Sequence, residues 1–272
     1  FYMAKYNIEL SAAGETRKGS ACTINEDNFQ VGNYYKKKYS KDHDAYVIER
    51  LDGCRYMITS VYDGIGGGGV GKVASSYAAE DTYLMQKKLE DKLSGKEVSC
   101  VMQYFFQSVN NRIVRNQEKI TGTTGVICVV DRKKRKARFY WSGDSRGYLY
   151  RNQCLFQITK DQNVEERIKE QSYWMRKDFR YMEQAKYLTG FIGNDLCGYE
   201  FEPLKSSWIS LRDDDRILLL TDGISEVCSE RELEKEIQKS KSNIDCCGKI
   251  IKMARAYGSE DDMTIVSVRI QS

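Results

Sequence analysis

Histidine and proline are almost missing from this sequence, with one of each among 272 residues. The histidine, His43, lies in the polar segment 39–44, where we expect a loop. A serine or cysteine nucleophile that depends on a histidine base would have to use this one residue, so the sequence argues against that kind of catalysis. Zinc sites that combine histidine with cysteine are unsupported for the same reason.

The nine cysteines lack the spacing of a disulfide framework or a redox site. They form no C-x-x-C pair, and only Cys246 and Cys247 are adjacent. No cysteine is followed by arginine six positions later, so the phosphate-binding loop of thiol-based phosphatases is absent. We therefore expect reduced thiols in a cytoplasmic protein.

Long apolar runs are also missing. No stretch approaches the roughly eighteen consecutive apolar residues of a membrane span, and the N-terminus lacks the basic, apolar and small-residue order of a signal peptide. We expect a cytoplasmic protein without a membrane partner. The net charge is only +4, and the basic runs 36–38 and 132–136 are interpreted as solvated turns, the second as a hairpin tip. Since no aromatic or base-reading motif accompanies these runs, we expect no nucleic-acid partner.

The residues that are present indicate one globular domain over residues 1–272. Apolar residues make up 41% and charged residues 30% of the chain, with no repeat and no low-complexity linker. Clusters of strands alternate with pairs of helices, which predicts an α+β fold of mainly antiparallel sheets with helices on their outer faces. Strands are expected near 6–12, 47–48, 55–62, 123–130, 138–141, 147–150, 216–220 and 264–270, and helices over 74–93, 98–113, 231–238 and 244–256.

Acidic residues recur at the ends of the predicted strands. Asp63, Asp144 and Asp222 each follow an apolar strand, and Asp261 precedes the last one. If the last strand runs opposite to the others, all four carboxylates reach the same sheet edge, and Glu26 can join them from the first turn. Carboxylates that converge repel one another, so their pKa values rise or divalent cations lie among them. Oxygen ligands without histidine or thiolate indicate Mg²⁺ or Mn²⁺, although a single Asp-Gly pair is more often a turn.

The order of short motifs along the chain resembles the protein phosphatase 2C family, the metal-dependent serine/threonine phosphatases, in its bacterial form. Each motif is weak alone, but together they follow the family's order over nearly the whole chain. The matching segments are Asn25-Glu26-Asp27, Asp63-Gly64-Ile65-Gly66-Gly67, Ala74-Ser75, Gly122-Thr123-Thr124, Gly143-Asp144-Ser145-Arg146, Thr159-Lys160-Asp161-Gln162, Leu188-Thr189 with Gly193, Thr221-Asp222-Gly223-Ile224 and Asp261-Asp262-Met263-Thr264.

This resemblance implies a four-layer α-β-β-α sandwich with two Mn²⁺ or Mg²⁺ ions in a cleft between the sheet edges. Asp63 would bridge the two ions, and Gly64 would lend its carbonyl oxygen. Glu26 would hold one ion, whereas Asp222 and Asp261 would hold the other. Asp63 and Asp222 are accordingly the expected catalytic residues.

The resemblance also implies the reaction and its substrates. Two cations acidify a water that attacks phosphorus in line, so that no covalent intermediate is needed. Asp144 would help bind a third ion, and Arg146 is interpreted as a structural partner of a nearby acid. The substrates would be phosphoserine and phosphothreonine in proteins modified by a serine/threonine kinase. The polar, helix-forming segment at about 161–186 corresponds to the family's variable flap and would help select them.

Two positions depart from the family pattern. The arginine that usually grips the substrate phosphate is replaced by Cys22, which cannot supply the bidentate fork of arginine. We interpret Cys22 as a small buried residue and consider Arg17 or Lys18 as the replacement cation. Asp262 stands where asparagine is usual, and it either adds negative charge beside the metal ligand or points outward.

Two other functions remain open from the sequence. Loss of the phosphate-binding arginine is compatible with a phosphatase fold that is weakly active or inactive and serves as a regulatory or binding module. Residues 66–73 also nearly match the nucleotide-binding P-loop, but Val73 lacks the hydroxyl that holds Mg²⁺ there.

Overall fold

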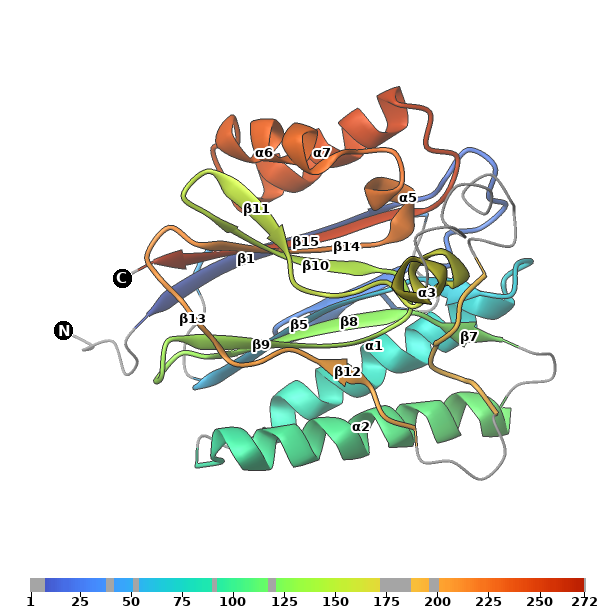
Figure 1. The fold of residues 1–272 in the computed structure, drawn as a ribbon, viewed down its shortest axis with the longest axis horizontal. Helices are drawn as coiled ribbons and strands as arrows, with labels where there is room; N and C mark the ends of the chain where they lie inside the picture. The colour runs from blue at the N-terminus through green and yellow to red at the C-terminus, as the bar shows by residue number, and fades with distance from the viewer. Residues whose placement is uncertain are drawn as a thin grey trace.

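The computed structural model describes residues 8–37, 42–50, 54–89, 92–116, 121–171, 187–195 and 201–271. Two β-sheets lie face to face, and helices cover the outer face of each (Figure 1). Every pairing among the described strands is antiparallel. The predicted α-β-β-α sandwich of antiparallel sheets is therefore confirmed.

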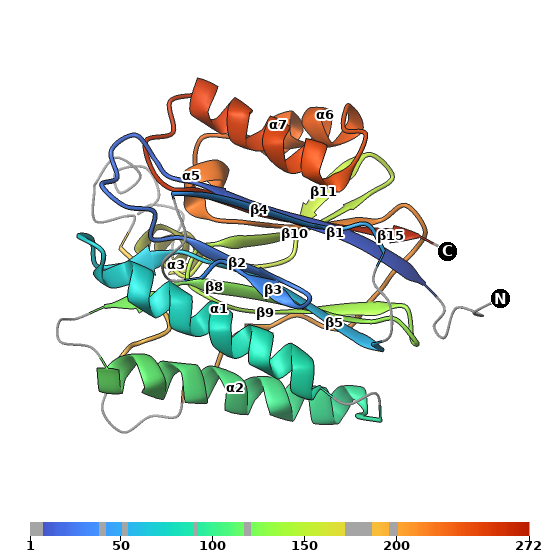
Figure 2. The ribbon, with the colours of Figure 1, turned by 180° about the vertical axis from the view of Figure 1, so that it is seen from behind.

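The first sheet joins strands from both ends of the chain. β1 lies between β4 and β15, so that the N-terminal and C-terminal strands pair along their whole length. Helices α6 (Glu230–Gln238) and α7 (Asn243–Ala256) cover its outer face (Figure 2). In spatial order its strands are β11 (Cys154–Gln157), β10 (Arg146–Arg151), β14 (Arg216–Leu220), β15 (Met263–Gln271), β1 (Glu9–Arg17) and β4 (His43–Ile48).

The second sheet is covered by the long helices α1 (Val70–Lys88) and α2 (Gly95–Asn116). In spatial order its strands are β12 (Leu204–Lys205), β9 (Lys136–Ser142), β8 (Gly125–Asp131), β5 (Tyr56–Tyr62), β2 (Asn28–Val31) and β3 (Tyr34–Tyr35), with β13 (Ile209–Ser210) also on β9. A small pair, β6 (Gly64–Ile65) and β7 (Gly122–Thr123), lies at one end of the sandwich. The short helices α3 (Val164–Gln171) and α5 (Asp222–Ser225) lie at the same end (Figure 1).

β5 shows why apolar residues occur on both of its faces instead of alternating with polar ones. Met57 and Val61 pack between the two sheets, whereas Tyr56, Ile58 and Tyr62 pack against α1 and α2. Successive side chains of a strand point to opposite faces, so a strand covered on both faces favours apolar residues on both, although β5 also buries Thr59 and Ser60. All seven residues of β5 are buried, and the strand brings Asp63 to the end of the sandwich in a fixed position.

The predicted helices and most strands are confirmed, with shifted ends. β1 extends to Arg17, beyond the predicted end near residue 12, because it is paired on both sides and buries even Glu15 and Thr16. The loop predicted around His43 is wrong, since this residue begins strand β4 and lies 3.5 Å from Glu15. No helix among the described residues is both long and apolar enough to cross a membrane.

The basic runs were only partly predicted. Residues 132–136 do connect β8 to β9 as a hairpin, and Lys133 and Lys134 are exposed. Arg132, however, is buried and donates hydrogen bonds to the carbonyl oxygens of Ile8 and Cys54. Lys36 is fully buried, so the prediction of a solvated turn is wrong at this residue, while the last residue of that run lies outside the described residues.

Candidate metal centre

The predicted acidic residues come from two sheets rather than from one sheet edge. Asp63 follows β5 in the second sheet, whereas Asp222 follows β14 and Asp261 precedes β15 in the first. Asp144 lies in the turn that connects β9 of the second sheet to β10 of the first. β15 does run opposite to β14, as the sequence argument required. The single sheet edge was wrong because sequence spacing does not tell which strands share a sheet.

Asp63, Asp144 and Asp222 form one cluster. Each offers a carboxylate oxygen, and the three oxygens lie within 4.8 Å of one another. Burial, followed by the charge of Asp222, raises the pKa of Asp144 to about 8. Burial and the charge of Asp261 raise the pKa of Asp222 to about 6. The pKa of Asp63 is raised well above its usual range by burial and then by Asp222.

These shifts indicate what the cluster needs. Burial and mutual repulsion both oppose the ionised form of each carboxyl group. Protons or a divalent cation must therefore neutralise the cluster. Its donors are carboxylate oxygens alone, which suit Mg²⁺ or Mn²⁺ better than a thiophilic metal.

The Gly122-Thr123-Thr124 segment holds Asp63 in place. The backbone amide of Asp63 donates to Thr124 Oγ1 at 3.2 Å, and its carbonyl accepts from the Thr124 amide and the Thr123 hydroxyl, both at 2.8 Å. The Thr124 hydroxyl also bonds to the Ser145 hydroxyl at 2.7 Å. One threonine thus ties the turn after β5 to the turn that carries Asp144.

Glu26 lies apart from the three aspartates. Its Oε1 accepts a hydrogen bond from the Gly69 amide at 2.6 Å, at the end of the glycine run. Its carbonyl accepts from the Ser75 hydroxyl at 2.5 Å, which gives a structural role to the Ala74-Ser75 motif. Burial raises its pKa, while the amides of the glycine loop lower it. Since this loop holds one of the chain's own carboxylates in an antiparallel fold, the P-loop interpretation is not favoured.

Gly64 lies where two chain segments cross. A Cβ atom there would meet the carbonyl oxygen of Gly71 at 2.4 Å and that of Glu26 at 2.7 Å. Only glycine fits at such a close approach of backbones. The Gly64 backbone consequently lies directly against the backbones of Gly71 and Glu26.

Asp27 belongs to this region, although the sequence argument gave it no role. It is 1% exposed, and the Thr221 hydroxyl donates to its Oδ2 at 2.8 Å. Its charge is one of the causes of the raised pKa of Asp63, and burial followed by the charge of Asp262 raises its own pKa. A signal did exist, because adjacent residues of an extended chain point opposite ways. If Glu26 faces the glycine loop, Asp27 has to face inward.

Lys36 is a second residue that the sequence argument missed. Its side chain is fully buried, and Nζ lies 3.4 Å from the carbonyl oxygen of Asn25. Burial lowers its pKa to about 8, whereas the charge of Asp27 acts in the opposite direction. It places one buried positive charge near Asp27 and Asp262.

Asp262 points inward, so the alternative of an outward orientation is wrong. It is 4% exposed, and its two oxygens accept from the amides of Gly19 at 2.8 Å and Glu26 at 2.7 Å. Asp261 is exposed, and its Oδ1 accepts from the amide of Asp262 and, at 3.4 Å, from the Cys22 thiol.

Cys22 is half-exposed rather than buried, which corrects the sequence interpretation. Of the two cations considered as replacements for arginine, Arg17 donates to Glu15 at 3.0 Å. Lys18 instead donates from Nζ to the carbonyl oxygen of Cys22 at 2.8 Å. Lys18 is therefore the cation beside the position where the family has its arginine.

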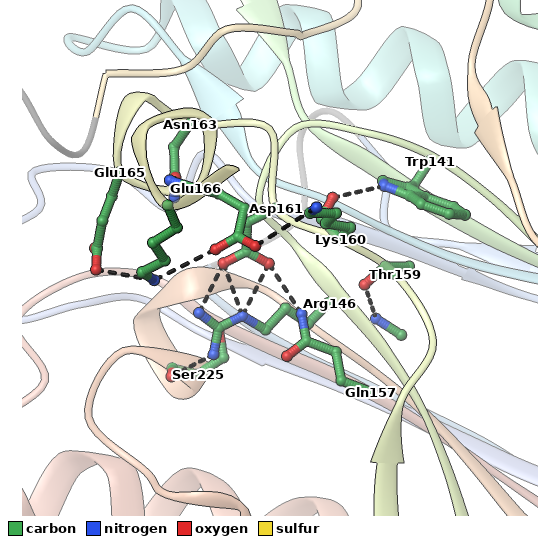
Figure 3. Close-up of polar contacts among 12 residues, drawn as sticks. Trp141, Arg146, Gln157, Thr159, Lys160, Asp161, Asn163, Glu165, Glu166 and Ser225 are labelled. Atoms are coloured by element: carbon green, nitrogen blue, oxygen red, sulfur yellow. Dashed lines mark hydrogen bonds and ion pairs between the residues drawn. The ribbon is translucent and has the colours of Figure 1, made fainter. Parts of the chain in front are cut away.

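Arg146 makes a bidentate ion pair with Asp161, Nε to Oδ1 and Nη2 to Oδ2, which confirms its structural interpretation (Figure 3). Nη2 lies 2.7 Å from Oδ2 of Asp161, and Nη1 donates to the carbonyl oxygen of Ser225 at 3.2 Å. Gln157 also donates to Asp161 at 3.1 Å. The arginine thus joins β10, the segment before α3 and the end of α5.

A cavity of about 290 Å³ extends from the cluster to α3. Asp144 and Asp222 line it together with Glu165, Glu166 and Lys169 of α3. The first part of the predicted flap, residues 161–171, thus lines an approach to the acidic cluster. The remaining residues of that segment, 172–186, lie outside the described part of the chain.

Known proteins resemble this chain over most of its length. The family model of protein phosphatase 2C matches residues 55–263. The serine/threonine phosphatase stp of Listeria monocytogenes serotype 4b is 25% identical over 236 residues, which cover 85% of this chain and 90% of that protein. The serine/threonine protein phosphatase PstP of Mycobacterium tuberculosis is 24% identical over 267 residues, covering 97% of this chain and 46% of the relative.

Solved structures resemble the fold. The serine/threonine phosphatase of S. agalactiae superposes with a TM-score of 0.79 at 18% identity, covering 96% of this chain and 99% of that one. The catalytic domain of PstP in complex with two manganese ions gives a TM-score of 0.73 at 21% identity, covering 98% of this chain and 100% of that one.

Proposed function

This chain belongs to the protein phosphatase 2C family, and on that premise we propose that it hydrolyses phosphoserine and phosphothreonine in proteins with Mn²⁺ or Mg²⁺. The proposal depends above all on one observation, the three carboxylate oxygens of Asp63, Asp144 and Asp222 within 4.8 Å of one another. Its relatives include serine/threonine phosphatases, and the structurally similar PstP domain binds two manganese ions.

Each acidic residue of the site would have its own role in binding the ions. Asp63 and Asp222 would be the central ligands, and Asp144 would add a ligand for a further ion. Gly64 would offer its carbonyl oxygen, and Asp261 and Glu26 would complete the set. Asp27, beneath the cluster, would orient a ligand or a metal-bound water through its carboxyl group.

Bound divalent cations supply a water of lowered pKa and neutralise the phosphoryl oxygens. The protein's own part is to hold the carboxylates in place before the substrate arrives. Thr123 and Thr124 fix the backbone of Asp63, and Thr124 connects it to the turn of Asp144 through Ser145. Arg146, bound to Asp161 and Ser225, fixes the far wall of the cavity. Such preorganisation reduces the reorganisation needed during the reaction.

Lys18 is the group that we assign to the phosphate in place of arginine. Its Nζ lies 2.8 Å from the backbone oxygen of Cys22. An ammonium group is a point charge and lacks the bidentate geometry of a guanidinium. We therefore expect phosphate binding that is weaker than with arginine but not lost, in an enzyme that acts on proteins phosphorylated by a serine/threonine kinase.

The alternative function is a regulatory or binding module without catalysis. The observations favour it less, because the buried acids of the cluster remain and each buried carboxyl group costs stability unless it is neutralised. A binding module that holds no metal would gain nothing from keeping these buried acids. Cys22 is the one feature that supports this alternative.

Hydrolysis of p-nitrophenyl phosphate and of a phosphothreonine peptide, with Mn²⁺ or with EDTA, tests the proposal. The wild type should turn over both substrates only with metal. Asp222→Asn should lose at least about 100-fold, since even changing the partners of metal ligands costs about 10–100-fold. Asp213→Asn is the matched control, because Asp213 is 51% exposed and pairs with Arg135.

Cys22→Arg separates the two functions. If the wild type is inactive with metal and Cys22→Arg is active, the protein is a binding module that has lost the residue that binds the substrate phosphate. If the wild type is active and Cys22→Arg mainly lowers KM, the phosphatase is established. Equal activity of Asp222→Asn and wild type would contradict the assignment of the site.

A further inference from the structure

Cys22, Asp261 and Asp262 form a second cluster of metal-ligating groups. One ligand atom from each, the thiol sulfur and two carboxylate oxygens, lies within 4.8 Å of the other two. This group has no member in common with the cluster of Asp63, Asp144 and Asp222. It contains a thiol, which the first cluster lacks.

Backbone contacts hold the two segments of this cluster together. The Gly19 amide donates to Asp262 at 2.8 Å, and the Ala21 amide donates to the carbonyl oxygen of Glu260 at 3.0 Å. At Gly19 a Cβ atom would meet the carbonyl oxygen of Glu260 at 2.2 Å, so the two backbone segments cross in direct contact. The thiol is therefore positioned by the fold and not by a flexible surface loop.

The spacing of the ligand atoms fits zinc. Zn–S and Zn–O bonds of about 2.3 and 2.1 Å at a tetrahedral angle place sulfur and oxygen about 3.6 Å apart. The Cys22 sulfur lies 3.4 Å from Oδ1 of Asp261. Both oxygens of Asp262 accept backbone hydrogen bonds, and each keeps a second lone pair for a ligand bond.

The cluster is also accessible. Cys22 is half-exposed and Asp261 is exposed, and both line a cavity of about 510 Å³ that also includes Asp222. A cation can enter from this cavity, and water can take the fourth position of a tetrahedral site. A thiolate among the ligands favours Zn²⁺ or Cd²⁺ over Mg²⁺ and Mn²⁺.

We propose that Cys22, Asp261 and Asp262 form a binding site for a thiophilic divalent cation, Zn²⁺, next to the catalytic cluster. Binding forms a metal–sulfur bond and releases the thiol proton to water, without any change of oxidation state. The cation would use Asp261 as a ligand, although the proposed function needs Asp261 as a ligand of the catalytic metals. Zinc would therefore inhibit the phosphatase, and this consequence, unlike the site itself, rests on the proposed function.

Cadmium titration tests the site directly, since a Cd²⁺–thiolate bond has an ultraviolet charge-transfer band. The full chain without added catalytic metal is titrated as wild type, Cys22→Ser and Cys154→Ser. Cys154 is exposed and lies on β11, so its substitution is the matched control. We expect a saturable band in the wild type and in Cys154→Ser, and its loss in Cys22→Ser. A band of equal size in Cys22→Ser overturns the site.

Asp262→Asn examines the carboxylate part. Asparagine is the usual residue of the family at this position, so the variant should fold, and its Cd²⁺ affinity should fall by about tenfold or more. Iodoacetamide labelling gives an independent measurement: Zn²⁺ should protect Cys22, but not Cys154, from alkylation as located by mass spectrometry. Equal protection of both thiols, or of neither, argues against the site.

Phosphatase assays in Mn²⁺ with added Zn²⁺ then separate the two proposals. Zinc should inhibit the wild type and inhibit Cys22→Ser at least about tenfold less strongly. If the wild type is inactive with every metal but shows the cadmium band, the proposed function fails and the zinc site stands. If the phosphatase is active and Cys22→Ser keeps the band, the site fails and the function stands.

Discussion

Replacing Asp222 by asparagine should stabilise the protein when no divalent cation is bound. Its carboxyl group lies close to those of Asp63 and Asp144. Burial and the charges of Asp261 and Glu226 raise its pKa from 3.8 to about 6. An acid whose pKa is higher in the folded protein destabilises the fold when it ionises. This penalty is absent below the unfolded pKa, grows as the pH rises towards the folded pKa of about 6, and is complete above it.

The size of the effect follows from the two pKa values. The difference between 3.8 and about 6 corresponds to about 3 kcal/mol, at about 1.36 kcal/mol for each pH unit. Asp222 keeps partial contact with solvent, which screens part of this repulsion. We expect Asp222→Asn to raise the free energy of unfolding by about 1–3 kcal/mol at neutral pH and by about zero below pH 4.

Urea unfolding in EDTA and in Mn²⁺ measures both states. Mn²⁺ at about 100 times its Kd should add about 2.7 kcal/mol to the wild type and much less to Asp222→Asn, so metal should cancel or reverse the advantage of the variant. Asp213→Asn serves as the control and should change the free energy of unfolding by no more than about 0.5 kcal/mol in either condition. A lower stability of Asp222→Asn in EDTA at neutral pH would refute the reasoning. It would mean that the carboxylate gains more from its hydrogen bond to the Gly223 amide than it loses by repulsion.

Three further predictions concern other parts of the site. Lys18→Ala should raise KM for a phosphopeptide by about tenfold with little change in kcat, as measured by steady-state kinetics, whereas Arg17→Ala should not, because Arg17 pairs with Glu15. Gly64→Ala should lower the free energy of unfolding by about 3 kcal/mol or more, because its Cβ would lie 2.4 Å from the carbonyl oxygen of Gly71; wild-type stability in thermal unfolding would contradict this close approach. Deleting residues 164–186 while keeping Asp161 should change the preference among phosphopeptides more than the turnover of p-nitrophenyl phosphate, and equal losses on both substrates would remove the flap's role in selection.

The sequence predicted the helices, most strands and the acids at strand ends well. These features depend on local signals, namely the spacing of apolar residues and the glycine after Asp63 or Asp222. The antiparallel direction of β15 relative to β14 could also be predicted. Asp261 lies before its strand, whereas Asp222 lies after its own, so the two carboxylates meet only if the strands run in opposite directions.

The parts that the sequence did not predict depend on contacts between distant segments. Lys36 was expected in solvent, yet the chain after β3 returns beneath the Asn25-Glu26-Asp27 turn and buries it. Asp262 was left between two orientations because its partners, the amides of Gly19 and Glu26, are more than 230 positions away. No periodicity encodes such a contact, so it becomes visible only when the strands are assembled.

The origin of the acidic cluster in two different sheets has a mechanical consequence. A cation held by Asp63 and Asp222 would cross-link the ends of the two sheets, in addition to the apolar layer between them and hydrogen bonds such as that from Thr221 to Asp27. The distance between these carboxylates then depends in part on the thickness of that layer. A larger or smaller side chain at Phe139 or Leu219, which lie in this layer and not in the cluster, would increase or decrease the distance between the carboxylates of Asp63 and Asp222. Metal affinity in this protein should thus respond to the volume of its hydrophobic interior.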